Sequence, residues 1–171
     1  DLLCKARVLR KVPACDPSGV PFGASARLGH FKPLLVDVGL WQHLSGMHVA
    51  AEYLREDLLS VYRGAMAEQF VGQEMVVSQG GDMYYWAREA RGSSAEVDFL
   101  ALVDGAVHAV EVKSGPAGSL KSLHLLLKTV PSVVDGLVFQ SGAYAELPEQ
   151  RLRFLPLYFA GSATQGATGR H

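Results

Sequence analysis

The sequence contains few of the features that mark a secreted, membrane-spanning or disulfide-bonded protein. Only two of the 171 residues are cysteines, and Cys4 and Cys15 lie too far apart for a metal knuckle or a redox pair. No apolar run approaches the roughly 18 residues that a bilayer-spanning helix needs, and no basic-then-apolar signal sequence opens the chain. We therefore expect reduced thiols and a cytoplasmic protein without a membrane partner.

Charge is also scarce. Charged residues make up 19% of the chain, and 16 Lys and Arg against 17 Asp and Glu give a formal charge of −1. Without a global basic field, any nucleic-acid partner must be bound by a local patch. One small basic cluster lies near the start and could contact phosphates or be a solvated end of an element; it comprises Lys5, Arg7, Arg10 and Lys11. Apolar residues, at 49%, are sufficient for a globular core.

Hydrophobic periodicity predicts an α/β protein. Residues 14–30 are rich in Gly, Pro and Ser and predict a loop, so residues 1–30 are expected to be a connecting segment from a truncated upstream domain. The polar tail 161–171 is expected to be disordered. Strands are predicted at 31–37, 83–87, 96–103, 106–112, 136–140 and 152–159, and helices at 39–44, 48–60, 61–77 and 120–128, the last capped by Ser119.

The predicted strands 96–103 and 106–112 contain the residues that could carry chemistry. Between them Asp104-Gly105 is a two-residue hairpin signal, and the register that it sets places Asp98 opposite Glu111. Because both faces are mostly apolar, the hairpin is expected at the centre of a sheet between helices. Unbroken alternation then predicts one face made of Asp98, Leu100, Leu102, Val107, Ala109, Glu111 and Lys113, and another made of Val97, Phe99, Ala101, Val103, Val110 and Val112.

Two carboxylates that face each other repel unless a cation lies between them. Oxygen ligands of this kind suit Mg²⁺, or Mn²⁺, with water left over for a phosphate to displace. Lys113, on the same face as Glu111, would place an ammonium group beside the metal-bound water. Glu68, on the inward side of the helix predicted at 61–77, could supply a third carboxylate.

In the order helix, strand, strand, these residues resemble the PD-(D/E)XK phosphodiesterase core of restriction endonucleases and archaeal Holliday-junction resolvases. A longer set of motifs resembles the C-terminal domain of bacterial and archaeal AAA-type ATPases, and with the segment 31–40 the resemblance covers about residues 1–160. These motifs are Gly64 to Val71, Tyr84-Tyr-Trp86, Glu96 to Phe99, Glu111-Val-Lys-Ser-Gly115 and Ser119-Leu120. Val97 stands where the nuclease signature has proline, a position that varies widely.

The resemblance implies a restriction-endonuclease-like domain at residues 31–160, with a mixed central sheet flanked by helices. It implies that Asp98 and Glu111 bind Mg²⁺ or Mn²⁺, that Glu68 is an accessory ligand, and that Lys113 orients or activates the attacking water. The implied substrate is nucleic acid, with DNA as the expected form, and the implied partner is an upstream ATPase domain. These residues contain no Gly-x-x-x-x-Gly-Lys-Ser/Thr loop, so ATP hydrolysis is not one of their properties.

Each assignment has an alternative that the sequence leaves open. Asp98 and Glu111 could be a surface pair, Lys113 a solvated strand end, and Glu68 a glutamate bonded to the backbone. Glu96 would face Lys113 in the same register, so a cross-strand ion pair competes for that lysine. The six histidines have no zinc-ligand spacing, and the aromatic run 84–86 fits a core better than base stacking. The whole domain could also be a catalytically idle nuclease-like fold that binds nucleic acid or regulates the ATPase.

Overall fold

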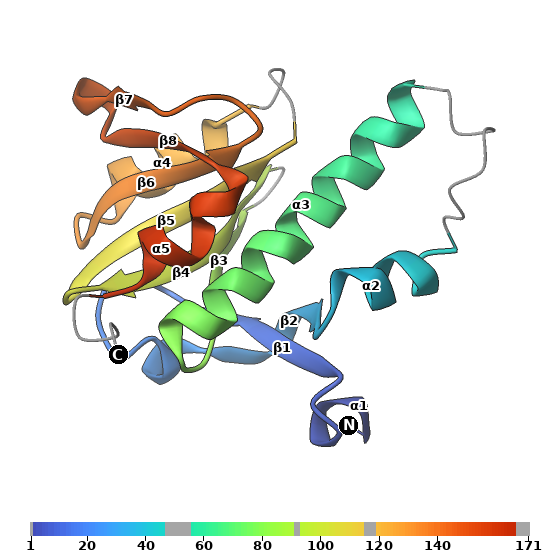
Figure 1. Ribbon diagram of the computed structural model, residues 1–171. Helices are drawn as coiled ribbons and strands as arrows, with labels where there is room; N and C mark the ends of the chain where they lie inside the picture. Colours follow the sequence, from blue (N-terminus) through green and yellow to red (C-terminus); the bar gives the residue numbers. More distant parts are fainter. Residues whose placement is uncertain (1, 47–55, 91–92, 115–118, 167–171) are drawn as a thin grey trace.

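The computed structural model describes residues 2–46, 56–90, 93–114 and 119–166, which build one mixed sheet with helices against it (Figure 1). The eight strands follow the order β2-β1-β3-β4-β5-β6-β8-β7. They are β1 (Leu9–Ala14), β2 (Arg27–Leu35), β3 (Tyr84–Ala90), β4 (Ser93–Val103), β5 (Ala106–Lys113), β6 (Val133–Gln140), β7 (Ala145–Leu147) and β8 (Leu152–Pro156). The helices are α1 (Leu2–Lys5), α2 (Val38–Leu44), α3 (Glu56–Gln79), α4 (Lys121–Thr129) and α5 (Ala160–Thr164), with 3-10 turns at Phe22–Ser25, Pro148–Gln150 and Leu157–Phe159.

Each face of the sheet has its own apolar core. On one face α3 and α5 pack on a cluster that includes Met75, Phe99 and Val110. On the other face the leucines of α4, Leu123 and Leu126 among them, pack on a second cluster. The predicted α/β class, a mixed central sheet flanked by helices, is therefore confirmed. No helix in the described ranges is both long and apolar enough to cross a bilayer.

The hairpin β4–β5 lies at the centre of the sheet, as predicted, with the predicted register from Phe99–Val110 to Val103–Ala106. The ladder ends at Phe99–Val110, so the predicted pairing of Asp98 with Glu111 is not formed. Its turn needs two residues with positive φ, and Asp104 (+49°) and Gly105 (+80°) supply them. After β5, the strand β6 pairs with β5 in parallel, and β8 pairs with β6 in parallel. This topology fixes the ends of β4 and β5 between α3 and α4.

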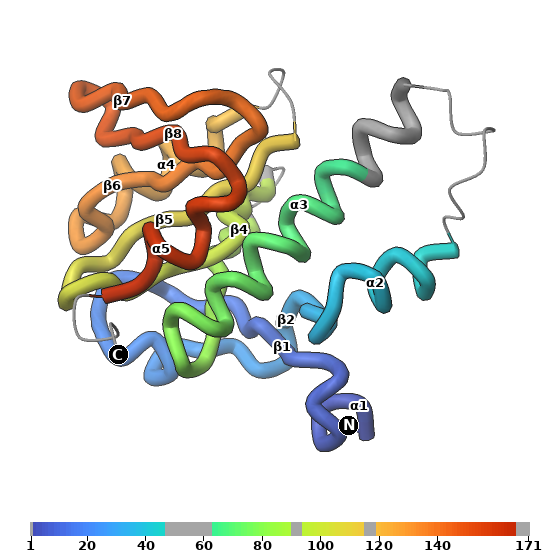
Figure 2. The backbone as a smooth tube through the Cα atoms, viewed as in Figure 1, coloured from blue at the N-terminus to red at the C-terminus, as the bar shows by residue number. Residues whose placement is uncertain are grey.

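The N-terminal part of the chain belongs to the same sheet. β1 pairs with β2 on one side and with β3 on the other, and Val12 and Ala14 are fully buried in the core under α3. Figure 2 shows the β1–β2 ribbon alongside the lower half of α3. The prediction of a loop over 14–30 is wrong at its C-terminal end, because residues 27–30 already belong to β2. The boundary expected between the segment 1–30 and the domain 31–160 therefore falls inside that strand. β2 is an edge strand with mostly exposed side chains, so it lacks an apolar pattern.

The structure also differs from expectation toward the C-terminus, where the strand predicted at 152–159 ends at Pro156 and Leu157–Phe159 form a 3-10 turn. Residues 160–164, predicted largely as disordered tail, form α5, which is fixed to α3 by a 2.6 Å hydrogen bond between the hydroxyls of Ser78 and Thr164. The cap of α4 is Leu120, without a side-chain bond, while Ser119 accepts a long 3.4 Å bond from the amide of Lys121. The helix predicted at 48–60 and the tail beyond 166 lie largely outside the described residues.

Candidate functional site

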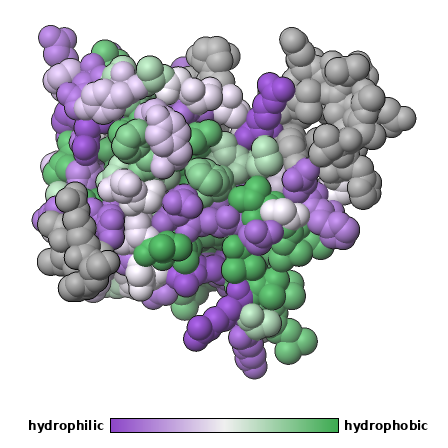
Figure 3. All heavy atoms as spheres, in the orientation of Figure 1, coloured by the Kyte–Doolittle hydropathy of each residue, from purple (hydrophilic) through white to green (hydrophobic). Residues whose placement is uncertain are grey.

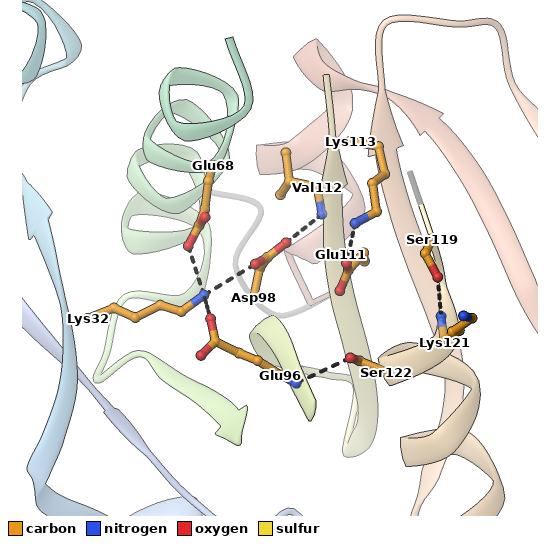
Figure 4. Close-up of polar contacts among 10 residues, drawn as sticks. All are labelled: Lys32, Glu68, Glu96, Asp98, Glu111, Val112, Lys113, Ser119, Lys121 and Ser122. Atoms are coloured by element: carbon orange, nitrogen blue, oxygen red, sulfur yellow. Dashed lines mark hydrogen bonds and ion pairs between the residues drawn. The ribbon is translucent and has the colours of Figure 1, made fainter. Parts of the chain in front are cut away.

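Three carboxylates converge on the ammonium group of Lys32, which comes from β2. Glu96 contributes an oxygen at 2.6 Å, Glu68 one at 2.9 Å and Asp98 one at 3.2 Å from Nζ (Figure 4). Glu68 stands on α3, whereas Glu96 and Asp98 stand on β4. We call these three carboxylates the acidic cluster. It lies beside a hollow of about 250 Å³ that Lys32, Glu68, Glu96 and Trp41 help to line.

Lys32 is held firmly in place. The Gln69 amide of α3 bonds both the N–H and the C=O of Leu35, three residues along β2, at 3.2 and 2.7 Å, which fixes the strand to the helix. The ammonium also lies over the rings of Tyr85 and Phe99, 5.2 and 5.9 Å from their centroids. Burial works against its charge, but the charges of Asp98 and Glu68 outweigh burial and raise the pKa of Lys32. Lys32 is therefore a permanent cation.

A β-bulge sets the direction of Asp98. Tyr84 pairs with Leu100 and Trp86 with Val97, so two residues of β4 face the single residue Tyr85 of β3. The predicted alternation was wrong at this point. Val97 packs with Leu100 on the α4 side, while Phe99 belongs to the α3 side together with Asp98, whose carboxylate meets Lys32 and Glu68. The second oxygen of Asp98 accepts a 2.8 Å hydrogen bond from the amide of Val112 in β5.

Glu111 and Lys113 form a separate pair on β5. The ammonium of Lys113 donates to Oε1 of Glu111 at 2.6 Å, whereas Oε2 of Glu111 is buried and has no hydrogen-bond partner among the described residues. The side chain of Glu111 is 8% exposed, so this oxygen is almost fully removed from water. In Figure 4 the pair projects from the side of β5 away from Asp98 and the acidic cluster.

Buried carboxylates in this region hold their protons unusually tightly. Burial and then the nearby charge of Asp98 raise the pKa of Glu111 from 4.5 to about 7 against the opposing effect of Lys113. Burial and the charge of Asp98 likewise raise the pKa of Glu68, although Lys32 opposes the shift. Asp98 therefore acts electrostatically on both groups and links the acidic cluster to the Glu111–Lys113 pair.

The predicted site residues are thus brought to one region but in two groups. Glu68 and Asp98 share Lys32, and Glu111 binds Lys113. Within the described part of the chain, no group of three or more His, Cys, Asp or Glu side chains is arranged to hold a metal ion. The ion pair considered between Glu96 and Lys113 is not formed; each has another partner.

The chemistry of the donors suits one small divalent cation, but Asp98 and Glu111 lie on different sides of β5, so both could hold the same ion only after one of these side chains turned toward the other. Mg²⁺ is usually bound by only one or two carboxylates, with water and phosphate oxygens completing its shell. Among the described residues, Oε2 of Glu111 is a buried acceptor without a donor, and each oxygen of Asp98 retains a lone pair beyond its one hydrogen bond. Four carboxylates and two ammonium groups, all ionised, leave two negative charges, which one divalent cation would neutralise.

Two other groups of residues considered from the sequence lie away from this region. Three members of the N-terminal basic cluster, Arg7, Arg10 and Lys11, line a hollow of about 1000 Å³ whose remaining lining is largely apolar, and Figure 3 shows apolar surface beside hydrophilic groups on this side of the molecule. His108 is buried and structural: its Nδ1 lies 2.5 Å from an oxygen of Asp135, which also binds Arg153.

Lys32 is the residue that sequence reasoning did not assign. Its only signal was its place in the segment 31–40, which matches the ATPase-associated domain, and a lone lysine on an exposed edge strand predicts nothing by itself. Its role depends on the position of β2, which packs against α3 and is separated from β3 by β1. This arrangement is set by the tertiary fold.

The fold and the site define a mixed α/β domain with clustered carboxylates on its central hairpin. A family model described as "Domain of unknown function (DUF4143)" matches residues 63–159, more than half of the chain. The chain belongs to this family, which is found at the C-terminus of AAA-ATPase-like proteins. No curated protein and no solved structure matches the chain.

Proposed function

We propose that this domain is a Mg²⁺- or Mn²⁺-dependent phosphodiesterase that cleaves nucleic acid, with DNA as the expected substrate, as the C-terminal part of an ATPase. The observation that carries the proposal is the buried Oε2 of Glu111, which has no hydrogen-bond partner among the described residues, beside the Lys113 ammonium and within the electrostatic reach of Asp98. An unpaired buried carboxylate oxygen destabilises a fold, so its presence favours a ligand that binds there.

The residues would divide the work as follows. Asp98 and Glu111 would hold the cation, with Glu68 as an accessory ligand once it exchanges its contact with Lys32. The bound cation supplies a water of lowered pKa and stabilises charge that develops on the phosphate. Lys113 lies 2.6 Å from a Glu111 oxygen, where its ammonium can orient that water or bind a phosphate oxygen.

A cleavage assay tests the proposal. Labelled single-stranded, duplex and branched DNA, and RNA, are incubated with the domain, alone and with its ATPase, in Mg²⁺, Mn²⁺ or chelator. We expect metal-dependent cleavage that Lys113→Met and Glu111→Gln reduce by about 10²–10⁴-fold. Lys128→Met, which removes an exposed lysine of α4, is the matched control and should leave the rate unchanged.

A second candidate function is supported by Lys32. Because its ammonium already satisfies the acidic cluster, the domain could be a nuclease-like fold that binds nucleic acid or regulates the ATPase without catalysis. The cleavage assay, combined with a binding measurement on the same substrates in chelator, separates the two proposals. Absence of cleavage of every substrate, combined with retained binding in chelator, would favour the non-catalytic module.

A further inference from the structure

The ammonium of Lys32 occupies a position that resembles a cation site. Its three N–H donors can each serve one carboxylate, and three carboxylate oxygens lie within 2.6–3.2 Å of Nζ. Asp98 joins this position to β5, since Oδ1 faces Lys32 while Oδ2 bonds the amide of Val112. Val112 follows Glu111, whose Oε2 is a further acceptor in this region and has no hydrogen-bond partner in the part of the chain that the structure describes.

We propose that Lys32 takes the place of a second divalent cation, so that the domain binds one metal ion, at Asp98 and Glu111, and uses the lysine as its other positive charge. The inference rests on the proposed function. In sites with two metals, the ions lie about 3.5–4 Å apart and stabilise the attacking and leaving oxygens together. Here a fixed ammonium would supply one of these two positive charges.

The charges in the region favour a single ion. With Lys32 and Lys113 in place, the four carboxylates retain two negative charges when all four are ionised, and one divalent cation then brings the region to neutrality. A second divalent cation would leave two positive charges in a partly buried site. It would also compete with Lys32 for oxygens of Glu68 and Asp98 that the lysine already holds.

Removal of the lysine charge should open the second position. Lys32, Glu68 and Glu96 help to line the hollow of about 250 Å³, and a water molecule takes up about 30 Å³ of liquid volume. The hollow therefore has room for a cation together with several of its waters. Without the ammonium, the acidic cluster would present three carboxylates to it.

The test counts bound metal. Mn²⁺ is titrated into the full chain and followed by calorimetry and by the electron paramagnetic resonance signal of free Mn²⁺. We expect one equivalent for the wild type and two for Lys32→Met, which keeps an apolar stem but removes the charge. Lys32→Arg should restore one equivalent, and the control Lys128→Met should bind one. Two ions held close together should also give a dipolar-coupled spectrum in Lys32→Met only.

The outcomes separate this inference from the proposed function. If the wild type binds no metal, both fail. If the wild type binds one ion and Lys32→Met also binds one, or if the wild type binds two, only the role of Lys32 is overturned. If Lys32→Met does not fold, the double variant Lys32→Met/Glu96→Gln removes one charge of each sign. It leaves Glu68 and Asp98 for the second ion and should still bind two equivalents; a single equivalent there overturns the inference.

Discussion

The carboxylate of Asp98 accepts a hydrogen bond of 2.8 Å from the main-chain amide of Val112. A side chain thus bonds the two central strands just beyond their last paired residues, Phe99 and Val110. The bulge at Asp98 makes this contact possible, because it directs the side chain out of the regular alternation. The candidate site therefore begins where the regular β4–β5 pairing ends.

Replacement of Asp98 by asparagine should destabilise the metal-free protein. Both carboxylate oxygens accept from donors, Val112 N–H and the Lys32 ammonium, so an amide must turn its own N–H₂ group toward one of them. We expect Asp98→Asn to lower the free energy of unfolding by about 1–3 kcal/mol, measured by urea denaturation in chelator. Asp104→Asn is the matched control, because asparagine also accepts the positive φ of the exposed turn; equal losses in both variants would contradict the prediction.

The raised pKa of Glu111 should make the free energy of unfolding depend on pH. The pKa of Glu111 is raised from 4.5 to about 7 by burial and by the charge of Asp98, so the folded state binds this proton more tightly than the unfolded state. The protonated Glu111 side chain makes its full contribution to the free energy of unfolding below pH 4.5. This contribution is lost as the pH rises through about 7, a change on the order of 3 kcal/mol. Urea denaturation in chelator at a series of pH values measures it.

Glu111→Gln provides the comparison for this pH dependence. The amide mimics the protonated acid and its oxygen can still accept from Lys113, so the variant should match the wild type near pH 4.5 and exceed its stability above pH 7. The difference between the two curves isolates Glu111 from Glu68, whose pKa is raised in the same direction, and from the histidines. Parallel curves for the two proteins would contradict the assignment.

The sequence was sufficient to predict the elements whose patterns are local. The Asp104-Gly105 turn predicts the register of the central hairpin, and the two-sided apolar pattern predicts its place between α3 and α4. The bulge at Asp98 has no local signal, because it arises from the pairing of β4 with β3. Alternation alone therefore placed Asp98 and Glu111 on one face, whereas the structure divides them between two groups.

Lys32 escaped prediction for a related reason. The charge that offsets the repulsion among the carboxylates was expected to be a metal ion, because no local sequence pattern connects Lys32 with the hairpin. The structure brings an ammonium from β2, 66 residues away from Asp98 along the chain. Contacts at that separation depend on the whole sheet order, in which β1 lies between β2 and β3.

Two glycines of α3 should respond oppositely to alanine. At Gly72 an added Cβ would lie 2.6 Å from Leu34 Cδ1 and 3.0 Å from Phe99 Cζ, so a buried contact between α3 and the sheet must shift. We expect Gly72→Ala to cost about 1 kcal/mol net, because overpacking outweighs the gain in helix propensity. At Gly64 the nearest atom is Ser114 Oγ at 3.5 Å, an ordinary contact, and Gly64→Ala should stabilise by about 0.5–1 kcal/mol. Thermal denaturation compares them, and stabilisation by both would show that α3 is not closely packed at Gly72.

Divalent metal should stabilise the wild-type fold, because a ligand that binds only the folded state shifts the unfolding equilibrium. A metal concentration 100 times the dissociation constant contributes about 2.7 kcal/mol to the free energy of unfolding, which is a rise in melting temperature of roughly 5–10 °C for a chain of this size.

Asp98→Asn and Glu111→Gln should abolish the response to millimolar Mg²⁺ or Mn²⁺, whereas Glu68→Gln should only weaken it, since Glu68 is engaged with Lys32. Glu149→Gln, an exposed change in the turn Pro148–Gln150, should respond as the wild type does. Because Oε2 of Glu111 is buried and has no hydrogen-bond partner within the described ranges, Glu111 is the ligand whose loss should matter most. An undiminished response in Glu111→Gln would place any bound metal elsewhere and remove the main support for cleavage at this hairpin.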